Sequence, residues 1–343
     1  MIGELMRIQF LRRLLVTNKA ILFAICLGAT FTFLSPVFLT ETNIFDELQQ
    51  VSVMLIVALG FTFVLGAAEI DLSIGGIVGL VGVIMGKLMV GGGVPVWLAV
   101  IIGLLCGAGC GAFNATIISQ IQIPPFVVTL ATGSLFTGLL YILTNLIPVS
   151  NLPNSFDDIG MGYVGPIPVP VFIVIPLILV AYVGAKKSVF GRYVVGLGAS
   201  PQVVHAAGVN VKRVRLGVYV VSGLACAAAS VVLTALSASA QVSAGSDLLL
   251  DVIAAVVIGG TPLFGGKMDI VGTVFGCLII EMINNGLNLL GVSSNYQIIS
   301  EGLVILLALT MDVQSTKFLA NLGKRQVRAS RLAEKAEMSQ RAG

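Results

Sequence analysis

Four polar side chains interrupt an apolar stretch in the last quarter of the chain and are the first candidates for chemistry. Glu281, Asn284, Asn285 and Asn288 are spaced so that they share one face if the stretch is helical. In a membrane, a carboxylate near a helix centre costs about 2.5–3.5 kcal/mol to insert, and such residues usually face a cavity or a partner. Two interpretations stay open: this face lines a translocation path or its gate, or it forms a hydrogen-bonded seam between helices.

A second candidate lies in a polar break between two apolar stretches. Asp71 stands there two residues before Ser73. A carboxylate is stabilised at the N-terminus of a helix, so Asp71 can cap the helix that follows. It is also a candidate for the translocation path. Glu69, in the same break, lies either at the cytoplasmic interface or toward the interior.

The other reactive residues form no catalytic pattern. His205 is the only histidine, and a lone histidine without a carboxylate or nucleophile is a poor base. The five cysteines fall inside apolar runs, where packing is favoured over metal binding. Neither Gly86-Lys87 nor Gly266-Lys267 has the residues of an ATP-binding phosphate loop. We therefore expect no catalytic residues, no metal ligands, no cofactor and no ATP hydrolysis by this chain itself.

The composition is that of an integral membrane protein. Apolar residues make up 57% of the 343 residues, charged residues only 10%, and the mean hydropathy is +1.04. A soluble domain carries about 25% charged residues. Because the apolar runs are long and do not alternate with polar residues, they predict helices rather than a barrel.

The basic residues indicate how the helices are oriented. Seventeen of the nineteen Lys and Arg lie within three segments, 1–19, 186–215 and 313–343. Basic segments stay on the cytoplasmic side of a membrane. Both termini and the central loop are therefore predicted to be cytoplasmic, with a membrane domain over 20–312. The net charge of +3 follows from these loops and predicts no nucleic-acid partner. The basic tail is expected either to contact anionic membrane lipid or to remain a solvated tail.

Because a span needs about twenty apolar residues, the chain divides into ten predicted spans. An acidic loop over 148–168, without Lys or Arg, is expected outside the membrane. The elements near 69–73 and 259–266 are expected to be broken or re-entrant. Glycines four residues apart predict close helix packing within the chain or at a dimer contact. The spans are 20–38, 51–68, 73–90, 94–117, 125–147, 169–185, 216–238, 248–263, 270–290 and 296–312.

The central loop contains a short sequence with helix signals at both ends. Ser200 is a good N-cap, Pro201 suits the first helical position, and Gly208 suits a left-handed stop. A helix of about two turns is predicted on the cytoplasmic face. It is either a docking element or an ordinary structured loop.

Several segments resemble the bacterial ATP-binding-cassette permeases for ribose, xylose and galactose, and most closely the ribose type. Besides Phe190-Gly-Arg-Tyr-Val-Val-Gly-Leu-Gly-Ala-Ser-Pro, they include Glu69-Ile-Asp-Leu-Ser-Ile-Gly, Ile123-Pro-Pro-Phe-Val-Val-Thr-Leu and Asp251-Val-Ile-Ala-Ala-Val-Val-Ile-Gly-Gly-Thr-Pro-Leu-Phe-Gly-Gly. The matches run in order from about residue 50 to 310. Glu69 and Glu281 depart from the family pattern, which has small or apolar residues at these positions.

The resemblance implies an all-α polytopic permease that moves a monosaccharide or related polyol across the bacterial inner membrane by alternating access. It implies a permease homodimer or heterodimer, a cytosolic ATP-binding subunit and an extracytoplasmic sugar-binding protein as partners. The residues that would dock on the ATP-binding subunit are Pro201, His205, Ala206, Ala207 and Gly208. The alternative is a secondary transporter driven by an ion gradient, for which Glu281 and Asp71 are the candidate ion ligands.

Overall fold

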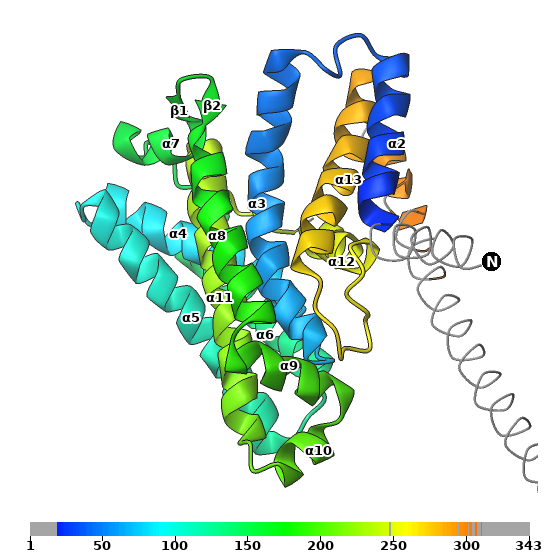
Figure 1. The fold of residues 1–343 in the computed structure, drawn as a ribbon. Helices are drawn as coiled ribbons and strands as arrows, with labels where there is room; N and C mark the ends of the chain where they lie inside the picture. Colours follow the sequence, from blue (N-terminus) through cyan, green and yellow to red (C-terminus); the bar gives the residue numbers. More distant parts are fainter. Residues whose placement is uncertain are drawn as a thin grey trace, which may run out of the picture.

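The structure, a computed structural model, describes residues 19–246, 248–293 and 295–300, together with Gly302, Leu303, Leu306 and Thr310. Its described part is a bundle of helices with one two-stranded hairpin (Figure 1). The elements are α2 (Lys19–Leu34), α3 (Glu41–Gly66), α4 (Ile74–Val90), α5 (Val96–Ile121), α6 (Pro125–Thr144), α7 (Asn154–Met161), β1 (Tyr163–Val164), β2 (Ile167–Pro168), α8 (Val169–Lys186), α9 (Val189–Ala199), α10 (Pro201–Ala206), α11 (Val211–Leu236), α12 (Leu248–Ile258) and α13 (Ile270–Leu289).

Helix α3 is the centre of the bundle. Its residues from Val51 to Gly66 are all buried, and α8, α11, α12 and α13 pack around it. Helix α11 also packs along α5, and α4 packs on α6 (Figure 1). A helix that is apolar on all sides is stable only when it is enclosed in this way.

The predicted all-α, polytopic architecture agrees with the structure. Helices α3, α5, α6, α8, α11 and α13 are long and apolar enough to cross a membrane, and α2, α4 and α12 are shorter apolar helices. Each predicted span between residues 20 and 290 coincides with one of these helices. Only part of the tenth predicted span, 296–312, is described, and the segments 1–19 and 313–343 lie outside the described residues except for Lys19.

Several predicted boundaries were wrong. Helix α3 begins at Glu41 and not at residue 51, because polar residues of its first three turns are held inside the protein. Asn43 donates to the Phe38 carbonyl at 2.9 Å, and Gln49 donates to the Gly160 carbonyl at 2.5 Å. Helix α12 ends at Ile258, before Gly260, whose φ is +96°.

Two predicted loops contain regular structure. The segment 148–168 holds α7 and the β1–β2 hairpin, in which Tyr163 pairs with Pro168. The segment 186–215 holds α9, α10 and the first turn of α11.

The glycine pattern produces close helix crossings within the chain. A side chain on Gly107 of α5 would meet the Gly223 carbonyl of α11, and one on Gly111 would meet the Tyr219 carbonyl. Gly276 of α13 faces the Ala255 carbonyl of α12 in the same way. Packing within one chain therefore accounts for these glycines.

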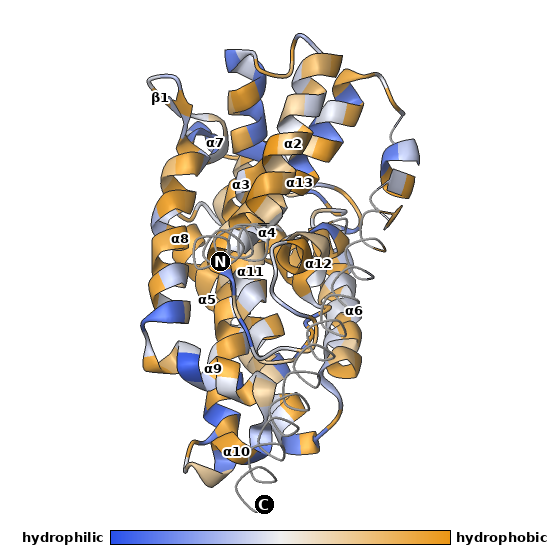
Figure 2. Ribbon diagram, turned by 45° about the vertical axis from the view of Figure 1, so that its right-hand side comes forward, coloured by the Kyte–Doolittle hydropathy of each residue, from blue (hydrophilic) through white to orange (hydrophobic). Residues whose placement is uncertain are grey.

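The bundle has two distinct ends. One end, here called the basic end, gathers the C-terminus of α8, α9, α10 and the start of α11, with Lys186, Lys187, Arg192, Lys212, Arg213 and Arg215. The turn between α2 and α3, α7 and the hairpin lie at the opposite end (Figure 1). Apolar residues dominate the helices between these ends (Figure 2).

Candidate coupling surface and membrane polar sites

The central loop forms the short capped helix that its sequence predicts. The Ser200 hydroxyl accepts the backbone N–H of Val203 at 3.4 Å, and Pro201 is the first residue of α10. Gly208 has a φ of +79°, a left-handed conformation that favours glycine and stops the helix. Two residues later Asn210 caps α11 by accepting the Arg213 N–H at 3.2 Å.

One side of helix α10 packs against the protein, and its other sides are exposed. Val204 is buried and lies against α9, where a side chain on Gly196 would meet its methyl group. The five residues predicted to dock on a partner are all exposed at the basic end: Pro201, His205, Ala206, Ala207 and Gly208. The structure brings these five residues together on one short helix and its stop.

An ion pair connects the start of α11 to the end of α3. The Arg215 Nε donates to the Glu69 Oε1 at 2.5 Å, and the Glu69 side chain is only 5% exposed. Glu69 lies just beyond the end of α3. The residue before it, Ala68, has a left-handed conformation with a φ of +58°. The sequence left the position of Glu69 open, and its carboxylate lies inside the protein.

Asp71 lies at the centre of a buried hydrogen-bond network between α3 and α4. Its carboxylate accepts the backbone N–H of Ser73 at 3.0 Å, the Ser73 hydroxyl at 2.5 Å and the Ser222 hydroxyl of α11 at 2.9 Å. Asn114 of α5 donates to the Ser73 hydroxyl at 2.8 Å. Asp71 is fully buried. These contacts support a structural role for Asp71 at the start of α4, and its place on the translocation path stays a prediction.

The two breaks expected near 69–73 and 259–266 lie side by side. The Gly266 N–H donates to the Gly66 carbonyl at 3.1 Å. Gly198 of α9 also faces the Gly66 carbonyl, with no room for a side chain. The end of α3, the loop before α13 and the segment leading to α10 therefore meet at one place.

The polar face of α13 is divided between two roles. Asn285 exchanges two hydrogen bonds with Asn43 of α3, at 2.9 and 3.2 Å, and so forms part of an interhelical seam. Asn288 is exposed, whereas Glu281 and Asn284 are half-buried. The seam interpretation therefore fits Asn285, and Glu281 remains the candidate for the path.

Several residues of these sites were not identified from the sequence. Ser222, Asn114 and Asn43 are polar residues within or beside apolar stretches, which was the available signal. Arg215 was counted only as part of a basic cluster. In the described part of the chain, no group of three or more His, Cys, Asp and Glu side chains is placed to hold a metal ion.

The described part of the chain is a polytopic helical bundle with a capped helix exposed at its basic end and buried polar contacts behind it. The chain belongs to the family described as the branched-chain amino acid transport system / permease component, whose model matches residues 43–309. It is accordingly a multi-pass protein of the inner, or plasma, membrane.

Its relatives are sugar permeases. The chain is 38% identical to the ribose import permease protein of Haemophilus influenzae, over 88% of this chain and 94% of that protein. It is 41% identical to the ribose import permease protein of Bacillus subtilis, over 82% and 88%. It is 36% identical to the D-allose transport system permease protein of Escherichia coli, over 83% and 87%. No solved structure matches the chain.

Proposed function

We propose that this chain is the membrane permease of an ATP-binding-cassette importer for a monosaccharide or related polyol. The names of the ribose and D-allose relatives support the cargo class. The observation that carries the proposal is the exposed, capped helix α10 at the basic end. Ten spans, with 1–19, 186–215 and 313–343 in the cytoplasm, complete the proposed topology of the membrane domain 20–312.

In this proposal, α10 docks on a cytosolic ATP-binding subunit through Pro201, His205, Ala206, Ala207 and Gly208. A second permease chain, identical or homologous, completes the pathway, and an extracytoplasmic binding protein delivers the sugar. The chain itself contributes no covalent chemistry. It alternates between two bundle states whose populations the partners shift through their different affinities for each state.

A short chain of contacts can carry movement of α10 into the membrane domain. Helix α10 packs on α9 and α11. Helix α11 holds Arg215 and Ser222, which bind Glu69 and Asp71 in the break between α3 and α4. A displacement of α11 therefore acts directly on the central helix α3 and on the start of α4.

Substitution of one docking residue should separate coupling from folding. Because Ala206 is exposed, Ala206→Arg should leave folding unchanged while its bulk and charge obstruct docking. We expect about tenfold lower ATP-driven uptake, equivalent to about 1.4 kcal/mol of lost docking free energy. Ala206→Ser, which stays small, should transport normally. Normal uptake by Ala206→Arg in proteoliposomes would contradict the docking role.

Glu281 is the second target for mutation. If its carboxylate faces the translocation path or its gate, Glu281→Gln should change the rate of transport without preventing assembly of the complex. Asn284 and Asn288, on the same face, are proposed to share that surface. Uptake and co-purification of the subunits, measured on the same preparation, test this. An unchanged uptake rate would remove Glu281 from the proposed path.

The proposed function is tested in proteoliposomes that contain the permease, its ATP-binding subunit and its binding protein. Uptake of labelled ribose or D-allose should require ATP and the binding protein. An ion-gradient-driven transporter would instead take up sugar with a sodium or proton gradient and no ATP. That second result would reject the importer.

A further inference from the structure

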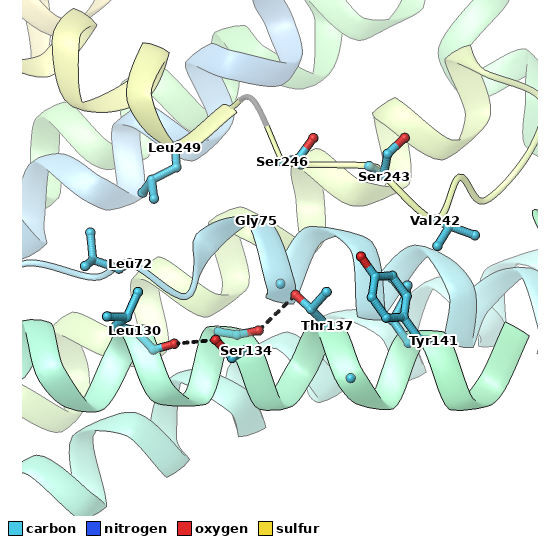
Figure 3. Close-up of a pocket in the computed structure, with 16 residues that line it drawn as sticks. Leu72, Gly75, Leu130, Ser134, Thr137, Tyr141, Val242, Ser243, Ser246 and Leu249 are labelled. Atoms are coloured by element: carbon cyan, nitrogen blue, oxygen red, sulfur yellow. Dashed lines mark hydrogen bonds between the residues drawn. The ribbon is translucent and has the colours of Figure 1, made fainter. Parts of the chain in front are cut away.

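A cavity of about 500 Å³ lies within the helix bundle (Figure 3). Its walls are α4, α6, residues 242–246 and Leu249 of α12. Its volume falls within the range of about 300–1,000 Å³ that is typical of small-molecule sites. The proposed function assigns no residue of this cavity to a role.

Glycine creates the space. Gly75 and Gly76 of α4 and Gly133 and Gly138 of α6 line the cavity. On Gly75 a side chain would meet the Gly245 carbonyl, so the backbone at Gly245 lies directly against α4. On Gly138, in contrast, a Cβ atom would meet nothing within 4 Å. The cavity is therefore open at Gly138, whereas α4 is closely packed against the backbone at Gly245.

Hydroxyl groups line this cavity from both sides. Ser134 and Thr137 come from α6, and Ser243 and Ser246 come from the facing segment. Tyr141 extends from α6 toward the segment that carries Val242 and Ser243 (Figure 3). Ser134 and Thr137 donate to carbonyls of their own helix, at 3.2 and 2.9 Å, which leaves their oxygens able to accept further hydrogen bonds.

The polar lining continues beyond the first cavity. A second cavity of about 260 Å³ shares Ser243, Ala244 and Gly245 with it. Thr234, Ser237, Ser239, Gln241 and Asp251 line this continuation. No Lys or Arg is among the described residues that line either cavity.

The polar part of this lining is mostly uncharged. Among the described lining residues only Asp251, in the second cavity, carries a charge, and the other polar groups are hydroxyls and one amide. Hydroxyl oxygens, an amide and the face of one tyrosine suit a neutral polyhydroxy compound, whose hydroxyls exchange hydrogen bonds while a ring face lies on the aromatic side chain.

We propose that the cavity between α4, α6 and residues 242–246 is a site where the sugar is held during its passage through the permease. This inference rests on the proposed function and adds the location of the cargo. It assigns Thr137, Ser243 and Tyr141 as contacts of the sugar.

The test fills the cavity without disturbing the fold. Gly138→Leu places a side chain in open space within the cavity. Gly109→Leu on α5 is the matched control, because Gly109 is exposed and a Cβ there also meets nothing within 4 Å. ATP-driven uptake of labelled ribose and D-allose should fall at least tenfold in Gly138→Leu and remain normal in Gly109→Leu. Both variants should co-purify with the ATP-binding subunit in equal amounts, which shows that the complex has assembled.

A milder variant keeps the proposal testable if Gly138→Leu fails to assemble. Thr137→Val preserves shape and removes one hydroxyl, so the KM for the transported sugar should rise about three- to tenfold. Normal transport by Gly138→Leu or by Thr137→Val would overturn the assignment of the cavity. Equal losses of transport in Gly138→Leu and in the control Gly109→Leu would also overturn it. If the wild-type complex shows no ATP-driven uptake of either sugar, the proposed function itself is rejected.

Discussion

Replacing Arg215 with methionine should destabilise the permease more than any other single change at its basic end. The variant leaves the carboxylate of Glu69 buried without its cation. Removal of one partner from a buried pair typically costs about 3–5 kcal/mol, because the remaining charge has lost its hydration. We expect the lower part of that range, since the Arg215 side chain is 21% exposed. The thermal unfolding temperature in mild detergent measures the effect.

Two controls make this result specific. Arg213→Met removes an exposed arginine two residues away on the same helix and should change the unfolding temperature little. Combining Arg215→Met with Glu69→Gln removes both charges and should recover much of the lost stability. If Arg215→Met and Arg213→Met unfold at the same temperature, the pair does not stabilise the junction of α3 and α11.

The second large effect is expected at the crossing of α5 and α11. Gly111→Leu would drive a side chain into the Tyr219 backbone carbonyl. A backbone atom moves only if the whole helix moves, so α11 must separate from α5. Overpacking of this kind typically costs about 1–3 kcal/mol and occasionally more. The separation would also displace Ser222, which holds Asp71.

The matched control is two residues away on the same helix. Gly109→Leu introduces the same side chain where no heavy atom lies within 4 Å of the new Cβ. Size-exclusion profiles and unfolding temperatures of the two variants should therefore differ strongly, with Gly111→Leu aggregated or less stable. Equal behaviour would mean that α5 and α11 do not cross as closely as these glycines indicate.

Local signals in the sequence were sufficient to predict helix α10. Ser200 caps the helix, Pro201 fixes φ at its first position, and Gly208 ends it in a left-handed conformation. Each of these effects acts over only a few residues. The apolar runs likewise predicted the positions of the long helices, because the burial of apolar surface and the satisfaction of backbone groups depend on the run itself.

The partners of buried polar groups could not be predicted in the same way. Ser222 reaches Asp71 across 151 residues of chain, and Arg215 reaches Glu69 across 146. Nothing local distinguishes Arg215 from the exposed Arg213. The early start of α3 was missed for a related reason: Asn43 and Gln49 look like loop residues until their distant partners are known. Arg215 supplies a cation beside the buried carboxylate of Glu69.

The most direct measurement is a crosslink from α10 to the ATP-binding subunit. Cysteine is introduced at Ala206, which is exposed, and separately at Val204, which is buried against α9. In membranes that contain the assembled transporter, Ala206→Cys should crosslink to the ATP-binding subunit with a yield that changes when nucleotide is added, and Val204→Cys should not. Absence of any crosslink from Ala206→Cys, or its labelling only from the extracytoplasmic side, would contradict the role of α10 as the coupling element.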